Sequence, residues 1–220
     1  MSKTFIIGDI HGCYYTLETV LDKIEKLICH EDTIVFLGDY FDRGLHNYKV
    51  YQKLMSLKEK EYNIVFLKGN HEELFYEAYE DEDYSLWFSN GGRKTWDDIP
   101  EDELAKLYSW TKELPYAYKD EENNLYCVHA YLPHTFIEDF DDEEKDSCLW
   151  NRAKYSSVGA KVFHGHTPHD GTIVTHINDI NIDTGCVFGG GLTFATISDK
   201  GSTVTYTTIP TDGKDLGKII

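Results

Sequence analysis

The feature that most constrains this 220-residue chain is the way its short apolar runs end. Five runs of β-branched and aromatic residues pass directly into turns made of Gly, Asp, Asn and His, which are the segments 8–12, 38–44, 69–72, 129–130 and 164–167. Such runs are typical of β-strands, and the first three are nearly continuous apolar runs, as expected of strands buried on both faces. The chain therefore carries its chemistry at the ends of buried strands.

Helical patterns separate the early strands. Apolar periodicity predicts helices over roughly 13–29 and 46–60, and two more over Glu72–Glu80 and Glu101–Glu113. The strands are expected at Thr4–Ile7, Thr33–Leu37, Asn63–Leu67, Leu125–Val128, Lys161–Phe163, Ile180–Ile182, Leu192–Ile197 and Thr203–Thr207. This order predicts an α/β domain with parallel strands early and antiparallel strands late.

No repeat, low-complexity linker or Pro-rich break interrupts this pattern. We therefore expect one domain over residues 1–209, followed by a loose C-terminal tail at residues 210–220. The acidic runs Glu77–Asp83 and Glu138–Asp146 are most simply solvated surface.

The charge balance limits the partners of the chain. It has 21 Lys and Arg against 39 Asp and Glu, a net charge of −18. This argues against binding to nucleic-acid backbones, which basic residues drive, and against anionic membrane surfaces. With 41% hydrophobic and 14% aromatic residues, the chain can form a sizeable core, so disorder is also excluded.

The cysteines and the N-terminus bear on the compartment. Five cysteines without a C-x-x-C pair fit free thiols in a reducing compartment. The first 15 residues do not resemble a signal peptide, and no 18-residue apolar stretch is present. We therefore expect a cytoplasmic protein.

The polar residues at the strand ends suit metal coordination. Consecutive β-α units place the carboxyl ends of parallel strands at one edge, where ligand crevices form. Mixed carboxylate, imidazole and carboxamide donors suit Mn, Fe or Zn, whereas Ca and Mg sites are more often all oxygen. The predicted metal ligands are Asp9, His11, Asp39, Asn70, His129 and His166.

Six ligands exceed what one catalytic ion with open positions needs. They divide between two divalent ions if Asp39 bridges, because the middle strand of the series faces both neighbours. Two such ions hold a water and lower its pKa, which supplies hydroxide at neutral pH. Manganese is the favoured ion, with Fe, Zn or Ni as alternatives.

The charges near this cluster indicate its electrophile. Two dications outweigh Asp9, Asp39 and the hydroxide, and Arg43 and Arg152 make the site more cationic still. Guanidinium groups bind a phosphate dianion in bidentate fashion.

A proton donor is also present in the third turn. His71 follows Asn70 directly, so it can face the leaving group as a general acid, and a nearby carboxylate such as Asp42 would keep it protonated.

These motifs resemble the signature blocks of the phosphoprotein phosphatase, or calcineurin-like metallophosphoesterase, family. The blocks are Gly8-Asp9-Ile10-His11-Gly12, Gly38-Asp39-Tyr40-Phe41-Asp42-Arg43-Gly44 and Gly69-Asn70-His71-Glu72. The compact bacterial and phage branch, typified by lambda phosphatase, is similar at Asn90-Gly91-Gly92, Trp150-Asn151-Arg152, His164-Gly165-His166-Thr167-Pro168 and Ile182-Asp183-Thr184-Gly185.

The resemblance runs from about residue 4 to residue 209. It implies a four-layer α/β/β/α sandwich and direct attack by metal-bound hydroxide, with no phosphoenzyme. It assigns Asp9 and His11 to the first metal, Asp39 to the bridge, and Asn70, His129 and His166 to the second metal. His71 and Asp42 become the general-acid pair, and Arg43 and Arg152, together with Asn70, become the substrate-binding residues.

The leading function is hydrolysis of phosphoserine and phosphothreonine in proteins, with phosphotyrosine left open and small phosphoesters as further substrates. The rival is symmetrical hydrolysis of diadenosine tetraphosphate, whose enzymes usually lack the residue that corresponds to Asp42. A phosphodiesterase is disfavoured by the acidic surface, and a catalytically silent phosphate-binding or metal-binding module by the complete ligand set. No regulatory subunit is implied.

Several residues have a structural reading beside the functional one. Cys127 is a core thiol or an oxidation-sensitive neighbour of the site, and Arg93 faces either substrate or solvent. His164 is expected to be a packing or supporting residue beside His166. Tyr40-Phe41 is expected to alter either the packing or the substrate edge.

Overall fold

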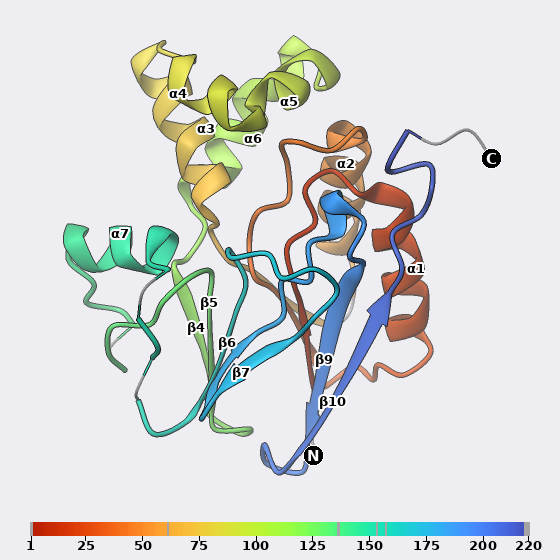
Figure 1. The fold of residues 1–220 in the computed structure, drawn as a ribbon, viewed down its shortest axis with the longest axis vertical. Helices are drawn as coiled ribbons and strands as arrows, with labels where there is room; N and C mark the ends of the chain where they lie inside the picture. Colours follow the sequence, from red (N-terminus) through yellow and green to blue (C-terminus); the bar gives the residue numbers. More distant parts are fainter. Residues whose placement is uncertain (1, 61, 136, 153, 157, 218–220) are drawn as a thin grey trace.

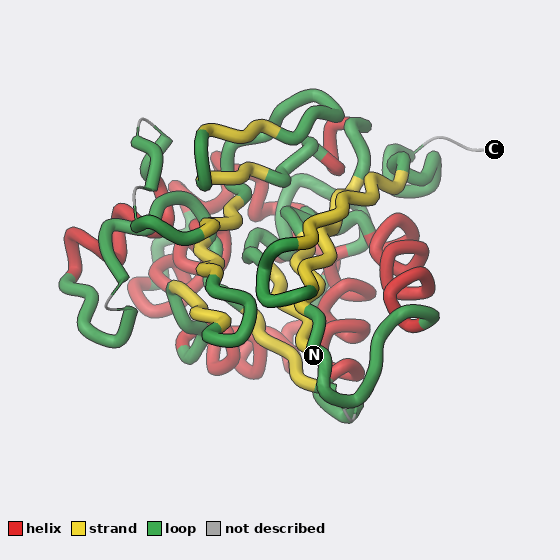
Figure 2. Tube along the Cα trace, turned by 90° about the horizontal axis from the view of Figure 1, so that it is seen from below, coloured by secondary structure: helices red, strands yellow, loops and turns green. Residues whose placement is uncertain are grey.

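Two five-stranded sheets lie face to face in the middle of the molecule (Figures 1 and 2). The structure, a computed structural model, describes residues 2–60, 62–135, 137–152, 154–156 and 158–217. The first sheet has the order β10 (Thr203–Ile209), β9 (Leu192–Ser198), β1 (Thr4–Ile7), β2 (Thr33–Phe36), β3 (Asn63–Phe66). The second has the order β4 (Ala117–Asp120), β5 (Leu125–Val128), β6 (Lys161–His164), β8 (Asp179–Asn181), β7 (Val174–His176).

Helices cover the outer faces of both sheets, which confirms the predicted α/β/β/α sandwich. On the first sheet lie α1 (Tyr14–Glu25) and α2 (Asn47–Leu57), and beside the second lies α7 (Asp142–Trp150) (Figure 1). A helical cluster above the sheets contains α3 (Asn70–Asp81), α4 (Ser85–Trp87), the π-helical turn η1 (Phe88–Gly92), α5 (Arg93–Asp98) and α6 (Glu101–Lys112). A short 3₁₀ turn, η2, spans Cys186–Phe188. Among the described residues, no helix is long and apolar enough to cross a bilayer.

The strand directions match the prediction in the first sheet and differ from it in the second. In the first, β1, β2 and β3 are parallel, and β9 and β10 are antiparallel. In the second, β6 and β8 are parallel to β5, whereas β4 and β7 pair antiparallel at the edges. The expectation of antiparallel late strands was therefore wrong for β6 and β8. Parallel pairing needs a long crossover, which the segment between β5 and β6 provides.

That crossover contains a helix in a segment that the sequence analysis read as solvated surface. Asp141 caps α7 by accepting a hydrogen bond from the Glu144 backbone N–H (2.9 Å), and the Glu144 carboxylate accepts one from the Asp141 N–H (3.0 Å). This reciprocal pair is a capping box. The acidic run 138–146 is therefore in part a helix start, because carboxylates favour the positive end of a helix dipole.

The two faces of each central strand enter different cores. Phe5 and Ile7 of β1 pack with α1 and α2, whereas Ile6 lies between the sheets. This alternation explains the continuous apolar runs, since both faces are buried. Cys127 of β5 belongs to the core between the sheets and is fully buried, which favours the core-thiol reading.

The tail is not loose over residues 212–217. Asp215 is buried against α1, whose own N-cap residue, Cys13, makes no side-chain cap. The Asp215 carboxylate accepts hydrogen bonds from the backbone N–H groups of Tyr15 (3.1 Å) and Thr16 (2.8 Å), and from the Thr16 hydroxyl (2.7 Å). The tail therefore caps α1 across about 200 residues of sequence. Residues 218–220 of the predicted tail lie outside the described residues.

Replacing this cap should destabilise the protein. In Asp215→Asn, the amide loses the negative charge and presents N–H groups to donors, so we expect the free energy of unfolding to fall by about 1–3 kcal/mol. At this chain length, each kcal/mol lowers Tm by about 2–4 °C. Thermal unfolding measures the change, and Asp170→Asn, at an exposed loop position, is the control. Equal Tm values for the two variants would contradict the capping role.

Candidate functional site

The predicted site residues meet at one end of the two sheets, where β1, β2, β3, β5 and β6 finish. All six predicted metal ligands are nearly inaccessible, with at most 4% of each residue exposed. Carboxylates and imidazoles are seldom buried to this degree without a partner. The topology therefore gathers, from distant parts of the sequence, the polar set that the strand-end turns predicted.

The turns that carry these residues are conformationally strained. Positive φ angles, which L-residues rarely adopt, occur at His11 (45°), Asp39 (51°), Asp42 (71°), Arg43 (66°) and His166 (69°). Each such residue costs on the order of 1–3 kcal/mol. Hydrogen bonds between the turns hold them in place: the backbone N–H groups of Ile10 and His11 both donate to the Asp39 carbonyl, at 3.1 and 2.9 Å.

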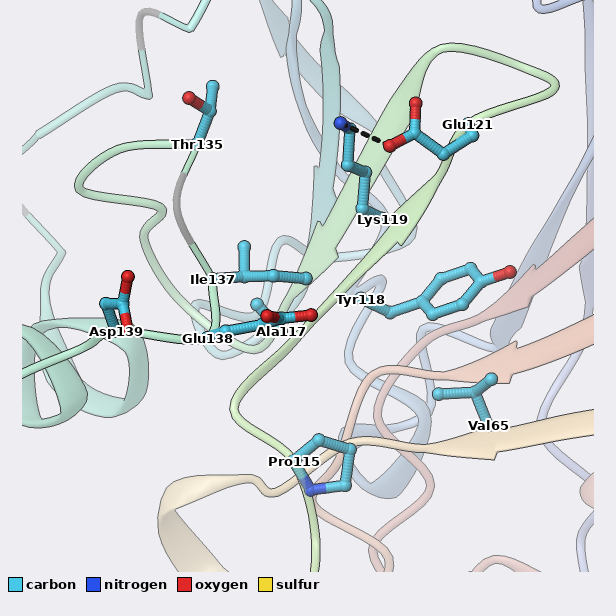
Figure 3. A pocket seen from close by; sticks show the side chains of 10 residues that line it. All are labelled: Val65, Pro115, Ala117, Tyr118, Lys119, Glu121, Thr135, Ile137, Glu138 and Asp139. Carbon is cyan, nitrogen blue, oxygen red and sulfur yellow. Dashed lines mark ion pairs between the residues drawn. The ribbon is translucent and has the colours of Figure 1, made fainter.

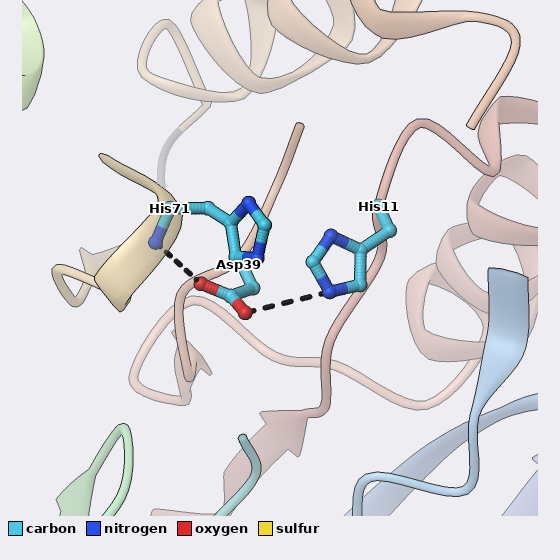
Figure 4. A group of neighbouring side chains, drawn as sticks. All are labelled: His11, Asp39 and His71. Atoms are coloured by element: carbon cyan, nitrogen blue, oxygen red, sulfur yellow. Dashed lines mark hydrogen bonds and ion pairs between the residues drawn. The ribbon is translucent and has the colours of Figure 1, made fainter. Parts of the chain in front are cut away.

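One donor group contains His11, Asp39 and His71 (Figure 4). The His11 Nε2 atom lies 3.4 Å from Asp39 Oδ2. Its Nδ1 lies 2.7 Å from the Phe41 carbonyl, so Nδ1 carries the proton and the Nε2 lone pair faces the site. Burial lowers the pKa of His11 well below its usual range, which keeps the ring neutral.

A second donor group contains Asp39, His129 and His166, with Asn70 beside them. His129 Nδ1 lies 2.9 Å from the Leu37 carbonyl, and burial lowers the pKa of His129, so its Nε2 also presents a lone pair. That atom lies 3.0 Å from Asn70 Oδ1 and 3.4 Å from Asp39 Oδ1. Acceptors that converge in this way fit a cation held between them.

Asn70 and His166 extend this second group. Asn70 Oδ1 lies 2.9 Å from His166 Nδ1. Burial, with a smaller contribution from His129, lowers the pKa of His166 to about 3, so this ring is also neutral. The Nε2 atom of His166 is buried without a hydrogen-bond partner. These atoms make a mixed N and O donor set of the kind that holds Mn, Fe or Zn.

Three carboxylates are concentrated at the centre. Burial, together with Asp183 and Asp39, raises the pKa of Asp9 well above its usual range, and Asp9 Oδ1 is buried with no partner. Burial also raises the pKa of Asp183 to about 6. For Asp39, burial acts in the same direction, but Coulombic attraction to the surrounding rings in their protonated form lowers its pKa. Where these rings are neutral, a bound cation would take over this role. Bound cations would compensate this buried negative charge, so the residues fit a divalent metal centre.

Asp9 differs from the other predicted ligands in its neighbours. The first donor group brings the atoms of His11, Asp39 and His71 within 4.8 Å of one another and does not include Asp9. Asp9 Oδ2 instead accepts a hydrogen bond from the His166 backbone N–H (2.9 Å), and Oδ1 remains available. Asp9 therefore keeps one unpartnered carboxylate oxygen that could bind a cation.

The predicted general-acid pair is formed. His71 Nδ1 lies 2.6 Å from Asp42 Oδ2, and neither side chain is more than 1% exposed. His71 Nε2 is buried without a partner. One ring nitrogen is thus fixed by a carboxylate, and the other is free to exchange a proton with a ligand.

The two predicted arginines flank the cluster. Arg43 Nη1 lies 2.5 Å from His11 Nε2. Arg152 is exposed, lies close enough to His166 to lower its pKa, and lines a cavity of about 130 Å³ together with Lys154 and Thr167. The site therefore carries one guanidinium beside each donor group.

Two acidic residues matter more than the sequence analysis recognised. Glu72 is 1% exposed, and its carboxylate accepts hydrogen bonds from the backbone N–H groups of Asp39 (2.8 Å), Tyr40 (3.0 Å) and Gly69 (3.0 Å). It therefore ties the second turn to the third. Asp183 lies against Asp9. In the sequence, both residues stand in recognisable motifs, Gly-Asn-His-Glu and Ile-Asp-Thr-Gly, but the motifs alone do not indicate what Glu72 and Asp183 contact.

Other residues with two readings take structural roles. Arg93 is exposed and paired with Asp97 one helical turn away, Nε to Oδ1 at 3.0 Å. His164 Nε2 lies 2.7 Å from Asp179 Oδ1. The buried Tyr40 hydroxyl donates to the Leu67 carbonyl (2.6 Å), so this unusual residue of the second motif serves packing.

A separate cavity of about 480 Å³ contains none of the predicted site residues (Figure 3). It lies beside β3 and β4, where Val65, Ala117 and Tyr118 line it. Among its described lining residues, the cation Lys119 is paired with Glu121, and Glu138 and Asp139 add further negative charge. The net negative lining makes this cavity unsuited to a phosphate dianion.

Comparison with known proteins identifies the family of this arrangement. The calcineurin-like phosphoesterase family matches residues 2–190. Serine/threonine-protein phosphatase 2 of Salmonella typhimurium is 30% identical over 205 residues, covering 86% of this chain and 90% of that protein. The asymmetrical bis(5'-nucleosyl)-tetraphosphatase PrpE of Oceanobacillus iheyensis is 30% identical over 227 residues, covering 90% of each.

Solved structures agree on the fold. A protein serine/threonine phosphatase from Saccharomyces cerevisiae superposes with a TM-score of 0.66 at 16% identity, covering 94% of this chain and 80% of that chain. At this identity the likeness concerns the fold alone.

The donor groups predict two metal ions per chain. After its metal has been removed with a chelator, we expect the protein to take up two equivalents of Mn²⁺ in a calorimetric titration. We expect His129→Ala to take up one equivalent, because the second group loses a central ligand while His11 and Asp39 remain. Elemental analysis after desalting provides an independent count.

His30→Ala removes an exposed imidazole and serves as the control for loss of a histidine as such. Two equivalents in His129→Ala, or one in the unaltered protein, would contradict the two-ion arrangement.

Proposed function

Since the chain belongs to the calcineurin-like phosphoesterase family and is therefore a phosphoester hydrolase that uses divalent metals, we propose that it is a phosphomonoesterase acting on phosphoserine and phosphothreonine in proteins. The observation that carries this proposal is the buried Asp42–His71 pair, in which His71 also reaches the first donor group. It offers a proton donor for an alkoxide leaving group, which a serine or threonine ester requires.

His71 would act through its unpartnered Nε2 atom. Hydrolysis consumes one water: the water oxygen forms a bond to phosphorus, and the bond from phosphorus to the ester oxygen breaks. That oxygen takes the proton from His71 Nε2, and a proton from the water restores the ring through solvent. Asp42 holds Nδ1 and stabilises the charged ring, so that Nε2 carries the transferable proton.

The proposed metal ligands are those expected from the sequence. Asp9 and His11 would bind the first ion, Asn70, His129 and His166 the second, and Asp39 both. When bound, the divalent ions supply Lewis-acid activation of water and of the phosphoryl oxygens. We propose manganese because imidazole, carboxylate and carboxamide donors are mixed here.

Substrate recognition is assigned to the two arginines. A phosphate dianion approaching the cluster meets Arg43 beside His11 and Arg152 beside His166. Two guanidinium groups in a chain with a net charge of −18 make this a local site for an anion. All five cysteines are free thiols, which supports a cytoplasmic enzyme.

A bis(5'-nucleosyl)-tetraphosphatase is the second candidate. The relative from Oceanobacillus iheyensis carries that name and is as similar as the phosphatase from Salmonella typhimurium, each at 30% identity. That relative is named asymmetrical, whereas the rival function expected from the sequence is symmetrical cleavage.

A substrate comparison tests the proposal. Mn²⁺-loaded protein is offered a phosphoserine peptide, p-nitrophenyl phosphate and diadenosine tetraphosphate in parallel, and kcat/KM is measured for each. We expect the phosphopeptide to exceed the dinucleotide. Preferential dinucleotide cleavage would overturn the proposal, and its products would show the mode: ATP and AMP if asymmetrical, ADP alone if symmetrical. Absence of metal-dependent turnover on all three would favour a silent binding module.

The general-acid role makes a separate prediction. His71→Asn should lower kcat on the phosphoserine peptide by about 10²–10⁴-fold, because the leaving group no longer receives a proton. Both metals should remain bound, since the proposed ligand set does not include His71. Steady-state kinetics and elemental analysis measure the two quantities, and a variant that loses a metal would show that His71 is a ligand instead.

A further inference from the structure

The segment 85–98, formed by α4, η1 and α5, was not recognised as helical from the sequence, yet it touches the general-acid pair. We infer that Trp87 and Thr95 in this segment are positioning residues that hold Asp42, and through it His71, in line for proton transfer. The inference rests on the proposed function, because it presupposes that His71 is the proton donor.

Thr95 binds Asp42 twice. The Thr95 hydroxyl accepts a hydrogen bond from the Asp42 backbone N–H (2.9 Å) and donates one to Asp42 Oδ1 (2.5 Å). Thr95 is only 1% exposed, so water does not compete for these bonds. The two bonds fix both the backbone of Asp42, whose φ is positive, and one oxygen of its carboxylate.

Trp87 binds the other carboxylate oxygen. Its indole Nε1 donates to Asp42 Oδ2 at 2.8 Å, and the same oxygen lies 2.6 Å from His71 Nδ1. Trp87 is 1% exposed, and its ring contacts Phe75 of α3 in a tilted arrangement, with ring centroids 5.0 Å apart. α3 is the helix that begins at Asn70 and His71. The carboxylate therefore has three donors on its two oxygens and cannot rotate without losing one.

The Asn90-Gly91-Gly92 motif explains how the indole comes this close. A Cβ atom on Gly92 would lie 2.3 Å from Trp87 Nε1, so this position requires glycine. The carbonyl of Gly91, whose φ is 105°, accepts a hydrogen bond from the Arg43 backbone N–H (3.2 Å). The segment thus holds the strained Asp42-Arg43 turn through hydrogen bonds to the Asp42 side chain and to the backbone.

The consequence for the reaction follows from the order of these contacts. Trp87 and Thr95 fix the orientation of the Asp42 carboxylate. The carboxylate fixes the orientation of the His71 ring, and the ring orientation determines where Nε2 delivers its proton. The gain is greatest when the leaving oxygen is strongly basic, because such an oxygen departs slowly without a proton. Among the described residues, the Trp87 and Thr95 side chains form hydrogen bonds with Asp42 and with none of the proposed phosphate-binding or metal-binding residues, so phosphate binding and metal binding should not depend on these two side chains.

The test compares leaving groups. Thr95→Val keeps the shape of the side chain and removes the hydroxyl donor. Trp87→Phe removes the indole N–H together with part of the buried ring system. Each variant is assayed with phenyl phosphate and with p-nitrophenyl phosphate, whose leaving group is less basic. We expect kcat on phenyl phosphate to fall about 10–100-fold, with a clearly smaller fall on p-nitrophenyl phosphate. KM on both substrates and the manganese content should be unchanged.

Matched variants separate positioning from general loosening. Trp96→Phe removes an indole from the same segment, and Thr111→Val removes a buried hydroxyl from α6, and both should keep the wild-type ratio of the two substrates. Thr95→Ser, which keeps the hydroxyl, should restore that ratio. The inference would be overturned if kcat of Trp87→Phe and Thr95→Val fell equally on the two substrates, or did not fall. Should Thr95→Val fail to fold, Thr95→Cys replaces the hydroxyl with a weak donor and answers the same question.

His71→Asn distinguishes this inference from the proposed function. If His71→Asn keeps the wild-type ratio, the general-acid assignment itself fails. If His71→Asn changes the ratio and the Trp87 and Thr95 variants do not, only the positioning inference fails.

Discussion

The burial of the Asp39 carboxylate among imidazoles is the interaction on which the rest of the site depends. Its Oδ2 atom faces His11 and its Oδ1 atom faces His129, each at 3.4 Å, so one side chain belongs to both donor groups. Oδ1 also accepts a hydrogen bond from the His71 backbone N–H (3.0 Å) at the start of α3. Because a buried charge is costly unless it is compensated, the N–H groups at a helix start and bound cations are needed around this one pair of oxygens.

Such a concentration of charge requires a rigid support. The site turns contain five non-glycine residues with positive φ, a cost that persists only when the surroundings over-determine the backbone. The two sheets provide that support, because their strands are packed on both faces and end together. Glu72 completes it: a carboxylate that faces no metal donor group accepts three backbone N–H groups and locks neighbouring turns.

The acidic residues near the site therefore divide by what they contact. Asp39 belongs to both donor groups, and Asp9 keeps a buried oxygen without a partner. Asp42 holds an imidazole, and Glu72 accepts hydrogen bonds from backbone N–H groups. At the other end of the chain, Asp215 caps a helix. The net charge of −18 is a sum over the whole chain, whereas the properties of the site depend on a few buried carboxylates whose neighbours differ.

Local patterns in the sequence determined the buried strands, the first helices and the residues that the site brings together, because strand ends of consecutive β-α units must share an edge. They did not determine the parallel course of β6 and β8, the cap that Asp215 supplies to α1, or the contacts of Glu72 and Asp183. Nor did they show that Trp87 and Thr95, 45 and 53 residues beyond Asp42, would bind its carboxylate. Periodicity and motif spacing report neighbours along the chain, whereas these contacts exist only once the layers have packed. Only the tertiary structure decides which buried donor meets which buried acceptor.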